Sequence, residues 1–290
     1  MIRKMGLGLP FWGFDGWQNG LYARDSRGGD YLRQYGRVFN AVEGNTTFYA
    51  TPSERSVARW REESPVSFRF CFKLPKAITH DAMLVDVESE TNVFLDRMRP
   101  LGDRMGPIMI QLPPSFGVEA LPNLDAFLEK LPRDFRYAVE FRDEILAQEG
   151  TAARLAEDIL DSAGVGRVIM DTRPLRDGPT ANPDILEARR KKPDLPIREE
   201  ALFAEPIVRI VSHPNAIINQ PWLERWAKIL AHWIRGGLDP VVFVHSPSNR
   251  ESPEIARKLH AMIAAIESVG EMPLWPGEEG ESASGQLSLL

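Results

Sequence analysis

Short apolar runs and longer amphipathic stretches alternate along the chain. The apolar runs are rich in β-branched and aromatic residues, and several lack strict polar alternation, which is typical of strands covered on both faces. Eight runs of this kind occur, at residues 11–14, 38–43, 68–73, 107–112, 135–141, 167–171, 206–211 and 241–245. The pattern therefore predicts eight buried strands, the first of them at FWGF, 11–14.

The stretches between these runs carry apolar residues at helical spacing. The clearest lie at 53–63, 89–102, 151–164, 220–237 and 252–270. Repeated alternation of strand and helix favours a parallel α/β sheet, and eight strands are the number of a closed (β/α)8 barrel of the TIM type. We therefore predict a single barrel domain within residues 1–270, with an open doubly wound sheet as the alternative.

Two stretches depart from the alternation. Residues 172–205 contain five prolines and predict a long loop after the sixth strand, with one helix near 185–192. The basic run 189–192 inside this loop could contact phosphate, although a short charged run is more typical of a solvated face. Residues 271–290 are acidic and contain Gly, Ser and Pro, which predicts a disordered tail.

Composition narrows the class of protein. With 43% hydrophobic and 26% charged residues, the chain resembles an ordinary globular protein. The net charge is −6, and four acidic residues without a basic one follow residue 270, so the predicted domain carries only −2. We therefore expect no direct nucleic-acid binding by the body. The single cysteine, Cys71, excludes an intramolecular disulfide.

The sequence also bears on location. No run approaches the ~18 consecutive apolar residues that predict a membrane span. The apolar run near the N-terminus is interrupted by Gly8, Pro10 and Gly13, which makes it a poor signal peptide. We expect a soluble cytoplasmic protein with no membrane partner.

Polar residues stand at the ends of nearly all the predicted strands. In a parallel barrel these ends meet at one mouth, where the chemistry of such proteins is located. The residues are Glu43, Asn45, Thr47, Lys73, His80, Gln111, Glu140, Arg142, Asp171, Arg209 and His245. A structural ion-pair network is the alternative interpretation, but barrel interiors are normally filled by branched apolar residues, so the pattern favours a functional site.

Four segments carry a family resemblance. They are EGNTTFYATP from Glu43, the stretch from Phe68 to His80 that contains FRFCFKLPKAITH, then QLPPSF, and then AVEFR. Together they resemble the YecE-like family, the domain of unknown function numbered seventy-two. The resemblance implies a TIM barrel with a polar pocket and no assigned reaction. The polar positions that it shares are Glu43, Asn45, Thr47, Tyr49, Lys73, Thr79, His80, Gln111, Glu140, Arg142 and Arg209.

The chain departs from the family pattern in three places. Many relatives have His where this chain has Asp143, an R-x-H-G segment where it reads Arg209 to His213, and F-N-N where it has His245 to Pro247. The residues that the resemblance implies for the site are therefore assigned most directly in the segment from Glu43 to His80.

From these residues we expect a site for an anion. Lys73, Arg142 and Arg209 would hold an anionic small molecule or phosphoester, and Glu43, His80 or Glu140 would act as general acid or base. Asn45, Thr47, Tyr49, Gln111, Asp171 and His245 are the other predicted substrate-binding residues. The protein is then either a hydrolase or lyase, or a non-catalytic module that binds an anionic ligand.

Other interpretations of single residues stay open. Lys73 could form a Schiff base, though pairing with a carboxylate or an anion is favoured. Cys71 could act as a thiolate, though a small buried hydrophobe is favoured. Glu43, Glu140, Asp171 and His245 could hold a divalent metal, which we do not favour because Lys73, Arg142 and Arg209 compete for the same carboxylates. No cofactor is identified.

The last five residues suggest a partner. Gln286, Leu287, Ser288, Leu289 and Leu290 resemble the Q-L-[S/D]-L-[F/L] segment with which bacterial replication and repair proteins bind the DNA sliding clamp. The glutamine amide can form hydrogen bonds and the two final leucines can fill a hydrophobic pocket. A terminal leucine in place of the commoner aromatic residue departs from that pattern, and a frayed end is the alternative.

Overall fold

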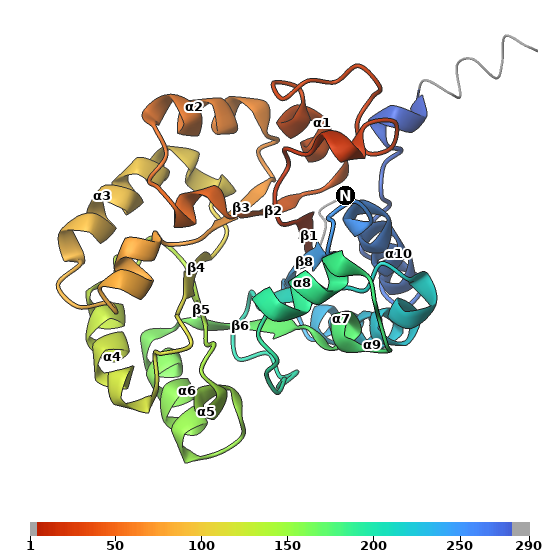
Figure 1. Ribbon diagram of the computed structural model, residues 1–290. Coiled ribbons are helices and arrows are strands. Elements are labelled where there is room, and N and C mark those ends of the chain that lie inside the picture. The colour runs from red at the N-terminus through yellow and green to blue at the C-terminus, as the bar shows by residue number, and fades with distance from the viewer. Residues whose placement is uncertain (1–4, 280–290) are drawn as a thin grey trace, which may run out of the picture.

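Eight parallel strands form a nearly closed barrel in the computed structural model, which describes residues 5–279 (Figure 1). The strands are β1 (Gly6–Leu9), β2 (Ala41–Gly44), β3 (Arg69–Phe72), β4 (Ile108–Gln111), β5 (Tyr137–Glu140), β6 (Gly166–Asp171), β7 (Ile207–Val211) and β8 (Val241–His245). Neighbours follow the order β3-β2-β1-β8-β7-β6-β5-β4. Isolated bridges between Phe70 and Met105 and between Lys73 and Met109 join β3 to β4. The predicted single (β/α)8 barrel is confirmed.

Helices surround the strands on the outside of the barrel (Figure 1). They are α1 (Tyr31–Val38), α2 (Glu54–Glu63), α3 (Glu88–Met98), α4 (Leu121–Lys130), α5 (Glu144–Ala147), α6 (Thr151–Ala163), α7 (Arg173–Arg176), α8 (Pro183–Lys191), α9 (Ala216–Arg235) and α10 (Ser252–Ala264). Local sequence sets several helix ends. Ser53 caps α2 by accepting a hydrogen bond from the Ser56 amide, and Gly164 ends α6 with a left-handed φ of 65°.

The first strand differs from the prediction. It is formed by Gly6–Leu9 and not by residues 11–14, which lie in the loop that follows. Glycine is required at position 8, because a Cβ there would lie 1.9 Å from the carbonyl oxygen of Ala41 on the neighbouring strand. Two glycines in a four-residue strand weaken the apolar signal, whereas the aromatic loop imitates a strand.

Alternate strand residues divide the core into two parts. Inward-facing apolar side chains fill the barrel below its mouth, two of them from β8, and form the apolar layer: Ala41, Cys71, Met109, Ala138, Val168, Ile207, Val241 and Phe243. Their neighbours in sequence, such as Val42, Ile110 and Val208, belong to the larger core under the helices. Because the side-chain period of a strand is two residues, this alternation also fixes which residues face the barrel mouth.

The segment after β6 contains more helix than predicted. Residues 173–176 form α7, and the predicted helix near 185–192 is α8, Pro183–Lys191. Arg189 holds the two helices together by donating hydrogen bonds to the carbonyl oxygens of Leu175 and Gly178, each at 2.9 Å. The chain then runs without regular structure to β7.

Residues 271–279, which follow the predicted domain boundary at Gly270, pack on the barrel. Trp275 is 2% exposed, and the guanidinium of Arg257 lies 3.2 Å from its ring centre. Glu278 pairs with the same arginine at 2.8 Å, and the Gly277 amide donates to the Gly20 carbonyl. An aromatic anchor thus orders an otherwise acidic stretch. Within residues 5–279, no helix is both long and apolar enough to cross a membrane.

Candidate functional site

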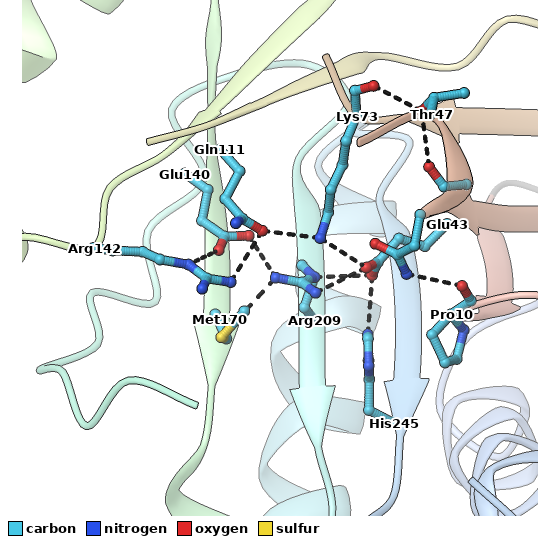
Figure 2. Close-up of polar contacts among 12 residues, drawn as sticks. Pro10, Glu43, Thr47, Lys73, Gln111, Glu140, Arg142, Met170, Arg209 and His245 are labelled. Atoms are coloured by element: carbon cyan, nitrogen blue, oxygen red, sulfur yellow. Dashed lines mark hydrogen bonds and ion pairs between the residues drawn. The ribbon is translucent and has the colours of Figure 1, made fainter. Parts of the chain in front are cut away.

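A polar layer lies directly above the apolar barrel layer. Each member follows a residue of the apolar layer by two positions, so its side chain points into the barrel on the same strand face. The members are Glu43, Lys73, Gln111, Glu140, Arg209 and His245, with Met170 at the equivalent place on β6. They converge at the carboxyl ends of the strands, as Figure 2 shows.

Arg209 is the centre of this layer and is 1% exposed. Its guanidinium donates two hydrogen bonds of 2.8 Å to Glu43, from Nε to Oε2 and from Nη2 to Oε1. Its Nη1 lies 2.5 Å from Oε2 of Glu140. His245 Nε2 lies 2.9 Å from Oε2 of Glu43, and since a carboxylate only accepts, this nitrogen carries the proton. One arginine on β7 therefore links carboxylates of β2 and β5 across the barrel.

Lys73, Gln111 and Arg142 form the second part of the network. The Lys73 ammonium donates to Gln111 Oε1 at 2.9 Å and lies 3.4 Å from Oε1 of Glu43. Arg142 donates from Nη2 to the same glutamine oxygen at 3.0 Å and from Nε to Glu140 at 2.8 Å. Gln111 thus accepts from two cationic side chains.

Burial and neighbouring charges set the ionisation of the layer. Burial opposes ionisation of Glu43 and Glu140, but Arg209 above all holds the pKa of Glu43 well below its usual value and lowers that of Glu140 to about 2. Burial, and then repulsion by Arg209, lowers the pKa of Lys73 to about 7. Burial lowers the pKa of His245 to about 4. At neutral pH both carboxylates are charged, His245 is neutral, and Lys73 is near its midpoint.

A pocket of about 430 Å³ opens above these residues. Its floor includes Lys73, Gln111, Arg209 and His245. Its walls are Pro10, Phe11, Asn45, Phe48, Tyr49, Arg142, Lys192 and Asn249. Phe11, Phe48 and Tyr49 give one side of the pocket an aromatic lining. The pocket therefore combines a cationic floor with ring surfaces at its wall.

Lys192, the last residue of the basic run 189–192, joins the site from the loop after α8. Its main chain is held by Arg176, whose Nη2 donates to the Lys192 carbonyl at 2.7 Å. Within the described residues no carboxylate pairs with its ammonium, and burial followed by repulsion from Arg209 lowers its pKa to about 8. The other basic residues of the run lie elsewhere, since Arg190 and Lys191 pair with Glu187 on the solvent side of α8. The basic run was the available signal, but only its last residue reaches the pocket.

The residues expected between Glu43 and His80 take different places. Asn45 lines the pocket and donates to the Pro10 carbonyl at 2.9 Å, which fixes the loop after β1. Thr47 is buried beneath the mouth and donates to the Lys73 carbonyl at 2.7 Å. Tyr49 lines the pocket and is 81% exposed. His80 lies outside the pocket, with its ring against Phe48 and Nδ1 2.9 Å from the Thr79 hydroxyl.

Asp171 also lies outside the pocket, contrary to the expectation for a residue at a strand end. It follows the inward-facing Met170 by one position and therefore faces the helices. Its carboxylate accepts from Trp226 Nε1 and from Arg173, both at 2.7 Å. These contacts fasten α7 and α9 to β6.

The remaining predictions concern Cys71, a metal site and the C-terminal segment. Cys71 belongs to the apolar layer, where burial raises the pKa of its thiol to about 12, so it is a small hydrophobe in the core. Within residues 5–279, no three side chains of His, Cys, Asp or Glu gather as metal ligands would. The QLSLL segment, 286–290, lies outside the described residues.

Sequence comparison identifies relatives over nearly the whole chain. The family model described as Protein of unknown function DUF72 matches residues 6–278. UPF0759 protein YecE of Escherichia coli K12 is 35% identical over 271 residues, which cover 93% of this chain and 97% of that protein. The protein of the same name from Escherichia coli O157:H7 shows the same identity and coverage.

Solved structures share the fold. A DUF72 family protein from Enterococcus faecalis V583 superposes with a TM-score of 0.69 at 16% identity, covering 93% of this chain and 99% of that one. A DUF72 family protein from Thermotoga maritima MSB8 gives 0.68 at 21% identity, covering 90% and 99%.

Proposed function

Since the chain belongs to the DUF72 family, whose barrel mouth here holds a polar pocket, we propose that it binds a small anionic molecule there and acts on it as a hydrolase or lyase. The observation that carries this proposal is the balance of charge in the pocket. Four cationic side chains, Lys73, Arg142, Lys192 and Arg209, face two carboxylates, Glu43 and Glu140. A ligand with one or two negative charges would balance them.

A phosphate ester fits this surplus best. Arg209 and Arg142 already bind the two carboxylates. Lys192 and the exposed part of the Arg142 side chain are left to bind the ligand. Charge-assisted hydrogen bonds from such groups are the strong ones in phosphate recognition. The aromatic wall formed by Phe11 and Tyr49 would contact the organic part of the ester.

The ionisation of the site favours Lys73 for proton transfer. Glu43 and Glu140 remain predicted catalytic residues, but with depressed pKa values they would be weak bases, could not serve as acids at neutral pH, and would act mainly by stabilising positive charge. Lys73 has a pKa of about 7, where both protonation states are populated. His80 remains a candidate only for a ligand that extends past Phe48.

The test is a binding screen followed by a turnover assay. Calorimetry and thermal shift would be measured with inorganic phosphate, phosphosugars and nucleotides, with and without Mg²⁺. We expect Arg142→Met and Lys192→Met each to weaken phosphate-ester binding about tenfold or more. Lys191→Met is the matched control, since this neighbouring lysine faces solvent. Equal affinity in all three variants would refute the proposal.

Turnover separates the two forms of the proposal. Release of a product from a bound ester supports the hydrolase or lyase. Tight binding with no chemical change, under conditions in which Arg142→Met abolishes binding, supports the anion-binding module instead.

A second proposal concerns the C-terminal segment. Its resemblance to sliding-clamp ligands, from Gln286 to Leu290, favours recruitment to DNA replication or repair through the clamp. Such recruitment raises the local concentration of the body near DNA although the body carries little charge. The full chain should bind a bacterial clamp with micromolar affinity, about −8 kcal/mol, and the Leu289→Ala, Leu290→Ala variant should not. Binding that ignores both leucines would exclude this role.

A further inference from the structure

The amines of Lys73 and Lys192 differ from the guanidinium groups of Arg142 and Arg209 in that they can lose a proton, and of the two Lys73 is the more deeply buried. It lies at the end of β3, almost wholly buried, with Nζ 2.9 Å from Gln111 Oε1 and 5.9 Å from the ring centre of Phe48. An amide oxygen can accept a hydrogen bond from a neutral amine as well as from an ammonium. These contacts therefore do not require the charge.

The carboxylates of the layer are already occupied. Arg209 holds both oxygens of Glu43, and the oxygen nearest to Lys73, at 3.4 Å, is one of them. Glu140 is shared between Arg209 and Arg142. Guanidinium groups do not lose their proton in proteins, so the positive surplus of a buried site is relieved at a lysine. A neutral, pocket-facing lysine is a nucleophile toward carbonyl carbon.

We propose that Lys73 forms an imine with an aldehyde or ketone that also carries a phosphate or carboxylate group. This inference rests on the proposed anion binding and names the substrate class of the same pocket. Lys192 and Arg142 would hold the anionic group, which places the carbonyl end of a short ligand over β3.

The chemistry balances without a further reactant. The Nζ lone pair attacks the carbonyl carbon, and one amine proton passes to the oxygen to give a carbinolamine. The C–O bond then breaks, and the hydroxyl leaves with the second amine proton as water, so that a C=N bond remains. Protonation of this imine nitrogen places positive charge beside Glu43, whose carboxylate is 3.4 Å from Nζ.

Pyridoxal 5′-phosphate is a suitable probe, because it joins an aldehyde, a phosphate and an aromatic ring. The full chain would be incubated with it at pH 7, reduced with borohydride and mapped by peptide mass spectrometry. We expect the reduced adduct on Lys73, formed roughly a hundredfold faster than on the exposed Lys130. Inorganic phosphate should compete, and pyridoxal without phosphate should react at least tenfold more slowly.

The controls distinguish this inference from the proposed function. Lys73→Arg retains a cation but cannot form an imine, so it should give no adduct at position 73. Lys191→Met should behave as the unaltered protein. An adduct only on Lys192, or labelling no faster than at Lys130, would overturn the imine while phosphate binding still stood. Failure to bind any phosphate compound would overturn the proposed function itself.

Discussion

At the scale of single residues, the site depends on one buried guanidinium. Arg209 is only 1% exposed, so Glu43 and Glu140 provide most of the stabilisation of its charge. Such groups are strongly coupled, and the loss of one partner leaves an uncompensated buried charge.

Removal of the charge of Glu43 should therefore destabilise the barrel. We expect Glu43→Gln to lower the free energy of unfolding by about 3–5 kcal/mol, measured by urea denaturation. Glu187→Gln is the matched control, because this carboxylate pairs with Arg190 on the surface, where solvent screens the pair, and its loss should change stability far less. Similar losses in the two variants would contradict the central role of Arg209.

Lys73 gives the stability a pH dependence of defined sign. Its pKa is about 7 in the folded protein and about 10.4 in the unfolded chain, so the unfolded chain binds more protons between these values. The cost of charging Lys73 is thus complete below pH 7 and disappears as the pH rises toward 10.

The variant Lys73→Met removes this cost. Relative to the unaltered protein, the variant should gain roughly 2–4 kcal/mol more in its free energy of unfolding at pH 6 than at pH 10. Loss of the hydrogen bond to Gln111 affects both pH values alike and cancels in the comparison. Urea titrations at the two pH values measure the difference, and a constant difference would show that Lys73 stays charged when buried.

Most residues of the layer could be found from the sequence, because each ends an apolar run. Asp171 is the exception, because alternate residues of a strand face opposite sides. Asp171 ends its run as plainly as Glu140 does, but it is one position out of step with the inward face. Where a buried strand is apolar on both faces, the sequence does not reveal which alternate set points inward.

At the scale of elements, the C-terminal stretch shows how one side chain overrides composition. Acidic residues, Gly and Pro predicted disorder from residue 271, yet Trp275 is inserted against Arg257. The apolar area of a single indole exceeds that of several small side chains, and a window average conceals it.

Truncation of this anchor should release the segment. Trp275→Ala should lower the free energy of unfolding by about 3 kcal/mol and expose residues 271–279 to limited proteolysis. Leu274→Ala, at a neighbouring position that is 67% exposed, should change stability by less than about 0.5 kcal/mol. Equal effects of the two substitutions would mean that the segment is held mainly by Glu278 and Glu279.

The sequence of the loop from 172 to 205 does not reveal which of its basic residues faces the pocket. The sequence predicts a helix near 185–192, but the direction in which Lys192 leaves α8 depends on hydrogen bonds from Arg176 and Arg189 to main-chain carbonyls. Contacts of this kind carry no sequence pattern. The basic run could therefore be noticed, while its one pocket-facing member could not be chosen.

At the scale of the whole molecule, strand count and connectivity were the most predictable features. Eight apolar runs separated by helices allow few arrangements, and the right-handed crossover of parallel strands reduces them further. Only the first strand was misplaced, because the close approach of Ala41 demands glycine where a strand signal needs bulk. The cationic mouth on a chain of net charge −6 is likewise a property of the fold and not of the composition.

The joint between β3 and β4 has a consequence for motion. There, two isolated bridges and the hydrogen bonds Gly106 N to Phe70 O and Leu74 N to Met109 O, both 3.0 Å, take the place of a continuous ladder. Lys73 stands on one side of this joint, and Gln111 and Arg142 stand on the other. An anion bound to residues on both sides would hold β3 and β4 together. In hydrogen–deuterium exchange, addition of a phosphate ester should slow the amides of β3 and β4 more than those of β7 and β8, whose ladder is already continuous. Uniform slowing around the barrel would instead indicate that the ligand stabilises the fold as a whole.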